Sequence, residues 1–164
     1  MTKLRKLTAL LLAGALTLLL LTACSGGGGS SGPEAQAEAK VMQAINKGRT
    51  TALANDPDMQ RIAKKKLTNK LANTNLDADL NGSIGRYKFY HDVKYDKETS
   101  TLTLIAQYDY QNTKLEDLIK YITDDSDASR LNFNQAGRWT KVGVAAETYN
   151  GKTYIAITLQ VKKT

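Results

Sequence analysis

Residues 86–110 alternate apolar and polar side chains along two segments, which Lys97-Glu98 separates. This pattern predicts a β-hairpin, because alternation places every second side chain on the same face of a strand. With the turn at Lys97-Glu98, His91 faces Leu104, and a shift by one residue would move the apolar residues of the two strands to different faces. A lone histidine on an apolar face is more typical of a hydrogen-bonded core residue than of a catalytic base.

Residues 139–162 repeat the pattern around Asn150-Gly151, a dipeptide that favours the tight turn of a two-residue hairpin. The predicted register sets Val144 against Ile157, and again one face of both strands is apolar. Gly143 lies in the middle of the first of these strands. It indicates either a β-bulge or the close approach of another backbone.

Apolar residues at three- and four-residue spacing predict two helices before the hairpins. The first covers residues 34–54, which are rich in helix-forming residues. The second follows Asn55-Asp56-Pro57, a capping residue with proline at the first helical position, and its apolar stripe continues to Leu71. Its run Lys64-Lys65-Lys66 is predicted to be a solvated face rather than a binding site.

A capping box at residues 113–116 begins a third predicted helix, which runs to about Thr123. The order of elements is therefore ααββαββ. The sequence predicts a single α+β domain at residues 34–164, in which two antiparallel hairpins form a sheet and the helices cover its apolar face.

Residues 1–23 have the layout of a secretory signal: three cations near the start, an apolar run, and small residues before Cys24. The sequence Leu21-Thr22-Ala23-Cys24 resembles the lipobox of bacterial lipoproteins, which implies cleavage before Cys24 and attachment of lipid to its thiol. A permanent transmembrane helix is the alternative, but the apolar run is slightly short for the hydrocarbon core. We expect a signal peptide at 1–23, a lipidated cysteine with a flexible Gly/Ser linker at 24–33, and a domain held on the extracytoplasmic face of the cell membrane.

The formal net charge is +7, and loss of residues 1–23 would leave a mildly basic chain. This excess favours weak attraction to anionic lipid or to a cell-wall polymer, and the chain has no motif typical of nucleic-acid recognition. Cys24 is the only cysteine, so lipidation would leave the domain without a thiol for a disulfide, a metal or a nucleophile. No cofactor is expected.

The pattern closest to a metal site begins at Asp77, where Asp79, Asn81 and Gly82 follow the spacing of a calcium-binding loop. The position that requires a bidentate glutamate is occupied by Lys88. Because aspartate, asparagine and glycine are also common in ordinary turns, the sequence favours a plain connection.

Two segments, WTKVGVAA at 139–146 and NGKTY at 150–154, resemble the last two strands of the CAP superfamily (cysteine-rich secretory, antigen-five and pathogenesis-related proteins). Residues 126–132 are similar to the family's Ser-x-x-His-Arg-x-Asn, and residues 45–49 are similar to its Asn-x-x-Arg start.

The resemblance implies a cavity that the family marks with two histidines and two acidic residues. At the position of the second histidine this chain has Ser129, and Gln107 stands about where a glutamate would fall. The first histidine has no counterpart. The chain is therefore similar to a degenerate member that lacks the family's histidine pair.

These patterns favour a non-enzymatic binding role at the bacterial cell surface, with a wall polymer, a small apolar ligand or another protein as partner. An envelope hydrolase is the alternative. The chain has one histidine and neither Gly-x-Ser-x-Gly nor His-Glu-x-x-His, so such an enzyme would have to use loop carboxylates. Aromatic side chains on the face opposite the core suit sugar or peptide contact. The candidate ligand contacts are Gln107, Ser129, Tyr90, Tyr110, Tyr149 and Tyr154.

Overall fold

The computed structural model describes residues 32–47, 49–73, 76, 79–84, 87–108, 119 and 138–162. All of them belong to one compact unit, Ser31–Thr164. The elements are α2 (Pro33–Asn46), α3 (Pro57–Asn73), β1 (Gly82–Ile84), β2 (Tyr87–Tyr95), β3 (Thr99–Gln107), β4 (Trp139–Tyr149) and β5 (Lys152–Lys162).

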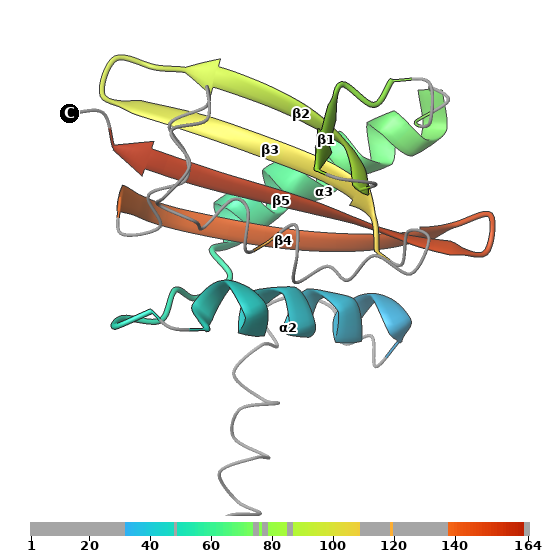
Figure 1. Ribbon diagram of the computed structural model, residues 1–164, viewed down its shortest axis with the longest axis horizontal. Coiled ribbons are helices and arrows are strands. Elements are labelled where there is room, and N and C mark those ends of the chain that lie inside the picture. The colour runs from blue at the N-terminus through green and yellow to red at the C-terminus, as the bar shows by residue number, and fades with distance from the viewer. Residues whose placement is uncertain are drawn as a thin grey trace, which may run out of the picture. The chain divides into compact units, whose positions relative to one another are not determined.

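The predicted α+β class is confirmed, with the helices first and two hairpins after them (Figure 1). The third predicted helix, residues 113–123, lies outside the described residues except for Ile119. That side chain is buried in the core.

The five strands form one antiparallel sheet in the order β1-β2-β3-β5-β4. Both predicted registers are confirmed, since His91 pairs with Leu104 and Val144 with Ile157. Asn150 and Gly151 have φ angles of 50° and 74°, the left-handed conformation that this tight turn requires. The short strand β1 was not predicted, because its three residues lie within a segment of turn-forming composition.

The two described helices cover opposite faces of the sheet, which corrects the expectation of one apolar face (Figure 1). On one face, α2 packs its apolar stripe, including Val41 and Ile45, against β4 and β5. On the other face, α3 buries Ala63, Leu67 and Leu71 in a second, smaller cluster. Small and apolar residues on that second face allow a helix to pack there. They include Ile105, Ala145 and Ala156.

Gly143 marks the place where the first turn of α3 crosses β4. A Cβ atom built on Gly143 would overlap the backbone of Met59 and Gln60. The predicted close approach of another backbone is therefore confirmed, and the absence of a side chain here allows the helix to reach the sheet.

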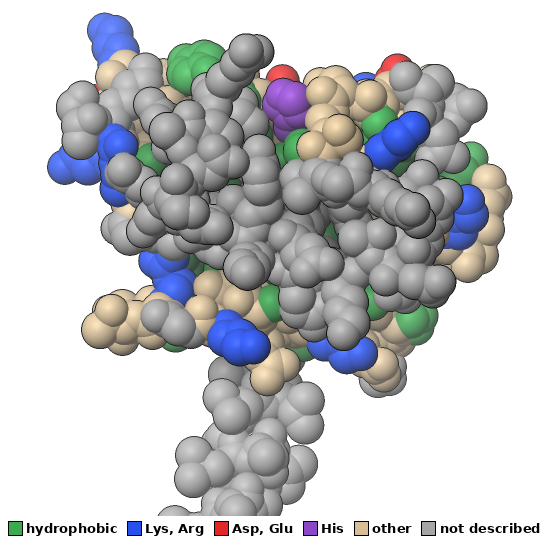
Figure 2. Space-filling view, viewed as in Figure 1, with side chains coloured by type: hydrophobic (Ala, Val, Ile, Leu, Met, Phe, Trp, Pro, Cys, Tyr) green, Lys and Arg blue, Asp and Glu red, His purple; other side chains and the backbone are tan. Residues whose placement is uncertain are grey.

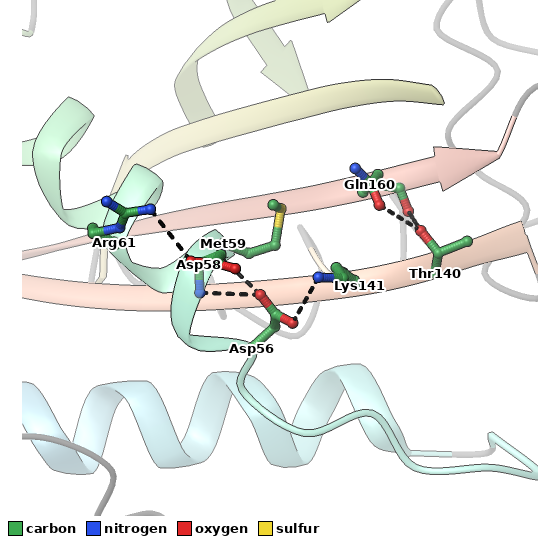
Figure 3. A network of polar contacts seen from close by, with 7 residues as sticks. All are labelled: Asp56, Asp58, Met59, Arg61, Thr140, Lys141 and Gln160. Atoms are coloured by element: carbon green, nitrogen blue, oxygen red, sulfur yellow. Dashed lines mark hydrogen bonds and ion pairs between the residues drawn. The ribbon is translucent and has the colours of Figure 1, made fainter. Parts of the chain in front are cut away.

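Asp56 caps the N-terminus of α3, as predicted (Figure 3). Its Oδ1 accepts hydrogen bonds from the backbone N–H groups of Asp58 (3.1 Å) and Met59 (3.0 Å), and its Oδ2 lies 3.4 Å from Lys141 Nζ. Burial alone would raise the pKa of this carboxyl group. The hydrogen bonds and Lys141 together outweigh burial and hold the pKa of Asp56 below its ordinary value.

Helix α2 ends at Asn46, eight residues before the predicted end. The side chain of Asn46 makes two hydrogen bonds with the backbone of Leu53, from Leu53 N–H to Oδ1 (2.8 Å) and from Nδ2 to Leu53 C=O (2.9 Å). These bonds hold a connection that turns back from the helix. An asparagine that bonds to the backbone in this way competes with continuation of the helix.

The outer edge of β4 is covered by side chains from the N-terminal part of the domain. Edge strands expose unpaired backbone groups, which natural proteins usually protect. Glu34 and Glu38 of α2 and Asn55 before α3 accept hydrogen bonds from successive outward N–H groups of β4. These bonds join Thr148 to Glu34 (2.7 Å), Ala146 to Glu38 (2.9 Å) and Val144 to Asn55 (2.8 Å).

Candidate functional site

A pocket of about 380 Å³ lies between the C-terminal half of α3 and strand β2. Its position follows from the fold, because α3 starts against β4 and crosses the sheet toward β2, where Lys66 reaches Asp92 (Figure 1). Six residues line it: Lys66, Asn69, Lys70, Asn73, Tyr90 and Asp92. Its volume falls within the range of about 300–1,000 Å³ that is common for small-ligand sites.

The helical part of the lining is a polar stripe beside the buried stripe of α3. Lys66, Asn69, Lys70 and Asn73 follow the three- and four-residue spacing of a single helix face. The neighbouring positions Leu67 and Leu71 are buried against the sheet, which fixes the direction of this polar face. Packing of the core therefore determines which polar side chains line the pocket.

Two lysine–aspartate pairs hold the sides of the pocket. Lys66 Nζ pairs with Asp92 on β2, and Lys70 Nζ donates a hydrogen bond of 2.8 Å to Asp79 Oδ2. The Lys70 ammonium also lies 4.1 Å from the centre of the Tyr90 ring, a cation–π contact. The hydrogen bond to Asp79 is the largest cause that raises the pKa of Lys70 above its ordinary value.

The chemistry of the lining combines carbon surface with hydrogen-bonding groups. The stems of the two lysines and the Tyr90 ring contribute apolar carbon, while amides, ammonium groups and a carboxylate stand around it. This arrangement can pack against an apolar ring face and bond to polar substituents at the edge of the same ring. Among the described residues, no three His, Cys, Asp or Glu side chains are placed to hold a metal ion.

The tyrosines predicted as ligand contacts have different positions in the structure. Tyr90 lines the pocket. Tyr149, beside the β4–β5 turn, is 43% exposed and lies away from the pocket lining. The expectation for Tyr154 is wrong: it is only 7% exposed and belongs to the second core cluster, because α3 covers the face on which it lies.

Gln107 is half-buried at the end of β3 and pairs directly with Tyr154 on β5. The structure therefore brings these two predicted residues together, but not into the pocket. Cys24, Ser129 and Tyr110 lie outside the described residues.

Five of the six lining residues were missed by sequence reasoning. The spacing of Lys66, Lys70 and Asn73 along one helix face was a signal, but a polar helix face is also the ordinary solvent side of an amphipathic helix. Within the run 64–66, Lys64 and Lys65 are exposed, as predicted, whereas Lys66 is half-buried. Lys66 pairs with Asp92, and Lys64 donates a hydrogen bond of 3.1 Å to the backbone C=O of Ala146.

His91 lies on the predicted face of β2, half-buried, with its ring centre 6.0 Å from that of Phe89. Its Nδ1 atom is buried and has no hydrogen-bond partner among the described residues, which differs from the hydrogen-bonded core residue that was expected. The backbone N–H and C=O of His91 are instead bonded to the side chain of Asn81 (2.7 and 2.9 Å). In the segment considered for calcium, Asn81 thus holds the edge of β2, and Asp79 pairs with Lys70.

Charged side chains are dispersed on the face that Figure 2 shows, where lysine and arginine of the described residues stand around its outline rather than in one patch. No helix in the described part of the chain is long and apolar enough to cross a membrane. No protein-family model, curated protein or solved structure matches the chain. The resemblance to the CAP superfamily therefore stays a prediction.

Proposed function

We propose that this chain is a lipid-anchored binding domain on the extracytoplasmic face of a bacterial membrane, and that the pocket between α3 and β2 binds a sugar unit of a cell-wall polymer. The pocket carries this proposal, because its carbon surface is surrounded by amide, ammonium and carboxylate groups. A sugar ring has the matching features, an apolar C–H face and hydroxyl groups at its edge.

The composition of the lining favours a polymer sugar over a small apolar ligand. Lys66, Lys70 and Asp92 place charged groups at the pocket. An apolar ligand would displace the water bound to these groups and offer no hydrogen bonds in its place. A sugar hydroxyl both donates and accepts hydrogen bonds, so it can take the place of that water.

A non-enzymatic role agrees with the engagement of the nearby carboxylates. Asp92 is paired with Lys66, and Asp79 with Lys70. In each pair the lysine occupies one carboxylate oxygen, so that oxygen is not free to act on a substrate. The alternative, an envelope hydrolase with loop carboxylates, predicts release of sugar fragments from purified wall material.

The proposal is tested by titrating the chain from Cys24 onward with soluble cell-wall glycan fragments and recording amide NMR shifts. We expect the shifts to concentrate at the pocket residues, and Tyr90→Ala to weaken binding about tenfold or more, as loss of one stacked aromatic contact does. Tyr95→Ala is the matched control, since Tyr95 is 69% exposed on the same strand but outside the pocket lining. Equal loss in both variants, or shifts elsewhere in the molecule, would refute the assignment of the pocket.

A further inference from the structure

The β4–β5 turn and the start of α2 lie at the same end of the domain. Glu34, the second residue of α2, accepts a hydrogen bond of 2.7 Å from the N–H of Thr148, two residues before Asn150 of the turn. The start of α2, which follows the linker in the sequence, therefore lies beside this turn. The β2–β3 turn and the end of β5 lie at the opposite end, because Thr99 pairs with Lys162.

The length of the linker limits which end of the domain can approach the membrane. The eight residues 25–32 are glycine and serine, and a chain of this composition spans about 16 Å on average. Strand β5 has 11 residues and is about 35 Å long. With lipid at Cys24, the β4–β5 end is within reach of the bilayer, whereas the opposite end is on average more than a linker length away.

The side chains at the β4–β5 end suit a surface of anionic headgroups. Tyr149 is 43% exposed, and Lys152, which pairs with it across the turn, is exposed as well. Among the described residues near this end, Glu147 is paired with Lys64 and accepts a hydrogen bond from Thr68, while Glu34 accepts the N–H of Thr148 and keeps its negative charge. Tyrosine is favoured at the level of the headgroups, and lysine is attracted to anionic lipid.

We infer that residues 149–152 contact the anionic headgroups of the leaflet in which Cys24 is anchored, so that the domain stands on its β4–β5 end. The inference rests on the proposed lipid anchor. A contact of one tyrosine and one lysine is weak by itself, but the short linker raises the effective concentration of the surface that it meets. In this orientation Tyr90 lies level with Ala156, four residues along β5 from Lys152, which places it about 13 Å from the turn.

The test uses the chain from Cys24 onward, which contains the whole compact unit, coupled through the Cys24 thiol to a maleimide lipid in nanodiscs that contain phosphatidylglycerol. A gadolinium-chelating lipid then broadens the amide NMR signals of residues near the surface. We expect residues 149–152 to lose signal intensity, while residues 96–98 at the opposite end keep theirs. Nanodiscs made only of phosphatidylcholine should cause a smaller loss.

Lys152→Glu, alone and with Tyr149→Ala, should restore the signals of residues 149–151, and Lys97→Glu is the matched control that should leave the broadening unchanged. Broadening at residues 96–98, equal broadening at both ends, or an equal response to Lys97→Glu would overturn the inference. Chemical coupling keeps this result separate from the proposed function, because it anchors the domain whether or not cells attach lipid to Cys24.

Discussion

Single residues determine how the two described helices contact β4. Gly143 permits contact because it has no side chain, and Glu38 uses its carboxylate as an acceptor for the N–H of Ala146 at the edge of the strand. Gly143 is needed because no side-chain volume is available there. Glu38 is needed because a backbone N–H at a half-buried position requires an acceptor.

Gly143→Ala should lower the free energy of unfolding by at least about 2 kcal/mol, because the new Cβ overlaps the backbone of Met59 and Gln60 and α3 would have to move. Denaturant melts measure the change. Gly32→Ala is the control, since a Cβ at Gly32 meets no atom within 4 Å. Equal stability of the Gly143 variant and the wild type would contradict the close approach of α3 to β4.

Glu38→Gln should preserve or raise stability at neutral pH, since glutamine keeps an acceptor for the N–H of Ala146 and carries no charge to be desolvated. Burial raises the pKa of Glu38, and the hydrogen bond from Ala146 and the charge of Lys64 offset this only in part. Protonation of Glu38 therefore favours the folded state of the wild type. The stability of the wild type should fall as the pH rises from below the unfolded pKa of about 4.5 through the folded pKa.

Denaturant melts between acid and neutral pH measure this dependence, and Glu38→Gln should remove the part that Glu38 contributes. Glu38→Ala should destabilise the protein at every pH, because the N–H of Ala146 loses its acceptor. The stability of Glu38→Gln could instead fall between acid and neutral pH by the same amount as that of the wild type. That result would show that Glu38 is not a source of the pH dependence.

At the scale of elements, the start of α3 is fixed by local chemistry and its position by tertiary contacts. Asp56 and Pro57 begin the helix, as the sequence predicts. The ion pairs of Lys64 with Glu147 on β4 and of Lys66 with Asp92 on β2 then attach its two flanks to different strands. Their contribution depends on pairings that no local pattern contains.

Asp56→Ala should cost about 1 kcal/mol of stability at neutral pH, the usual effect of losing an N-cap side chain. Because the pKa of Asp56 is held below its unfolded value, the stabilisation is present above that value, about 3.8, and is lost as the pH falls through the folded pKa. The difference between wild type and variant should therefore shrink in acid, as measured by thermal or denaturant melts.

Asp58→Ala is the control for this comparison, since the pair of Asp58 with Arg61 is exposed to solvent and a surface pair contributes little. A stability difference between wild type and Asp56→Ala that stays constant from neutral pH to well below 3.8 would rule out the capping carboxylate as its source.

At the scale of the whole molecule, the proposed anchor depends on one residue. Cys24→Ala should leave the domain folded but remove the protein from the membrane fraction, because lipid can attach only at that thiol. Labelling cells with a radioactive fatty acid detects the attached lipid, and separating membranes from soluble protein measures membrane retention. Wild-type protein that stays with membranes without carrying label would exclude the lipoprotein assignment.

The sequence by itself determined the elements whose signals are local. Alternation and the Asn150-Gly151 turn set the register of each hairpin, and Asp56-Pro57 set the start of α3, because these features depend on neighbours in the chain. The shorter α2 escaped prediction, since the bond of Asn46 to Leu53 closes a connection that helix propensity does not describe.

Only the tertiary structure decided which face of the sheet each helix covers. Tyr154 has the same alternation whether its face meets water or α3, so its burial depends on long-range packing. The same holds for the pocket, because Lys70 and Tyr90 are 20 positions apart in the chain and become neighbours only when α3 crosses the sheet. Periodicity tells which side of an element is apolar, whereas the contacts between elements determine what that side meets.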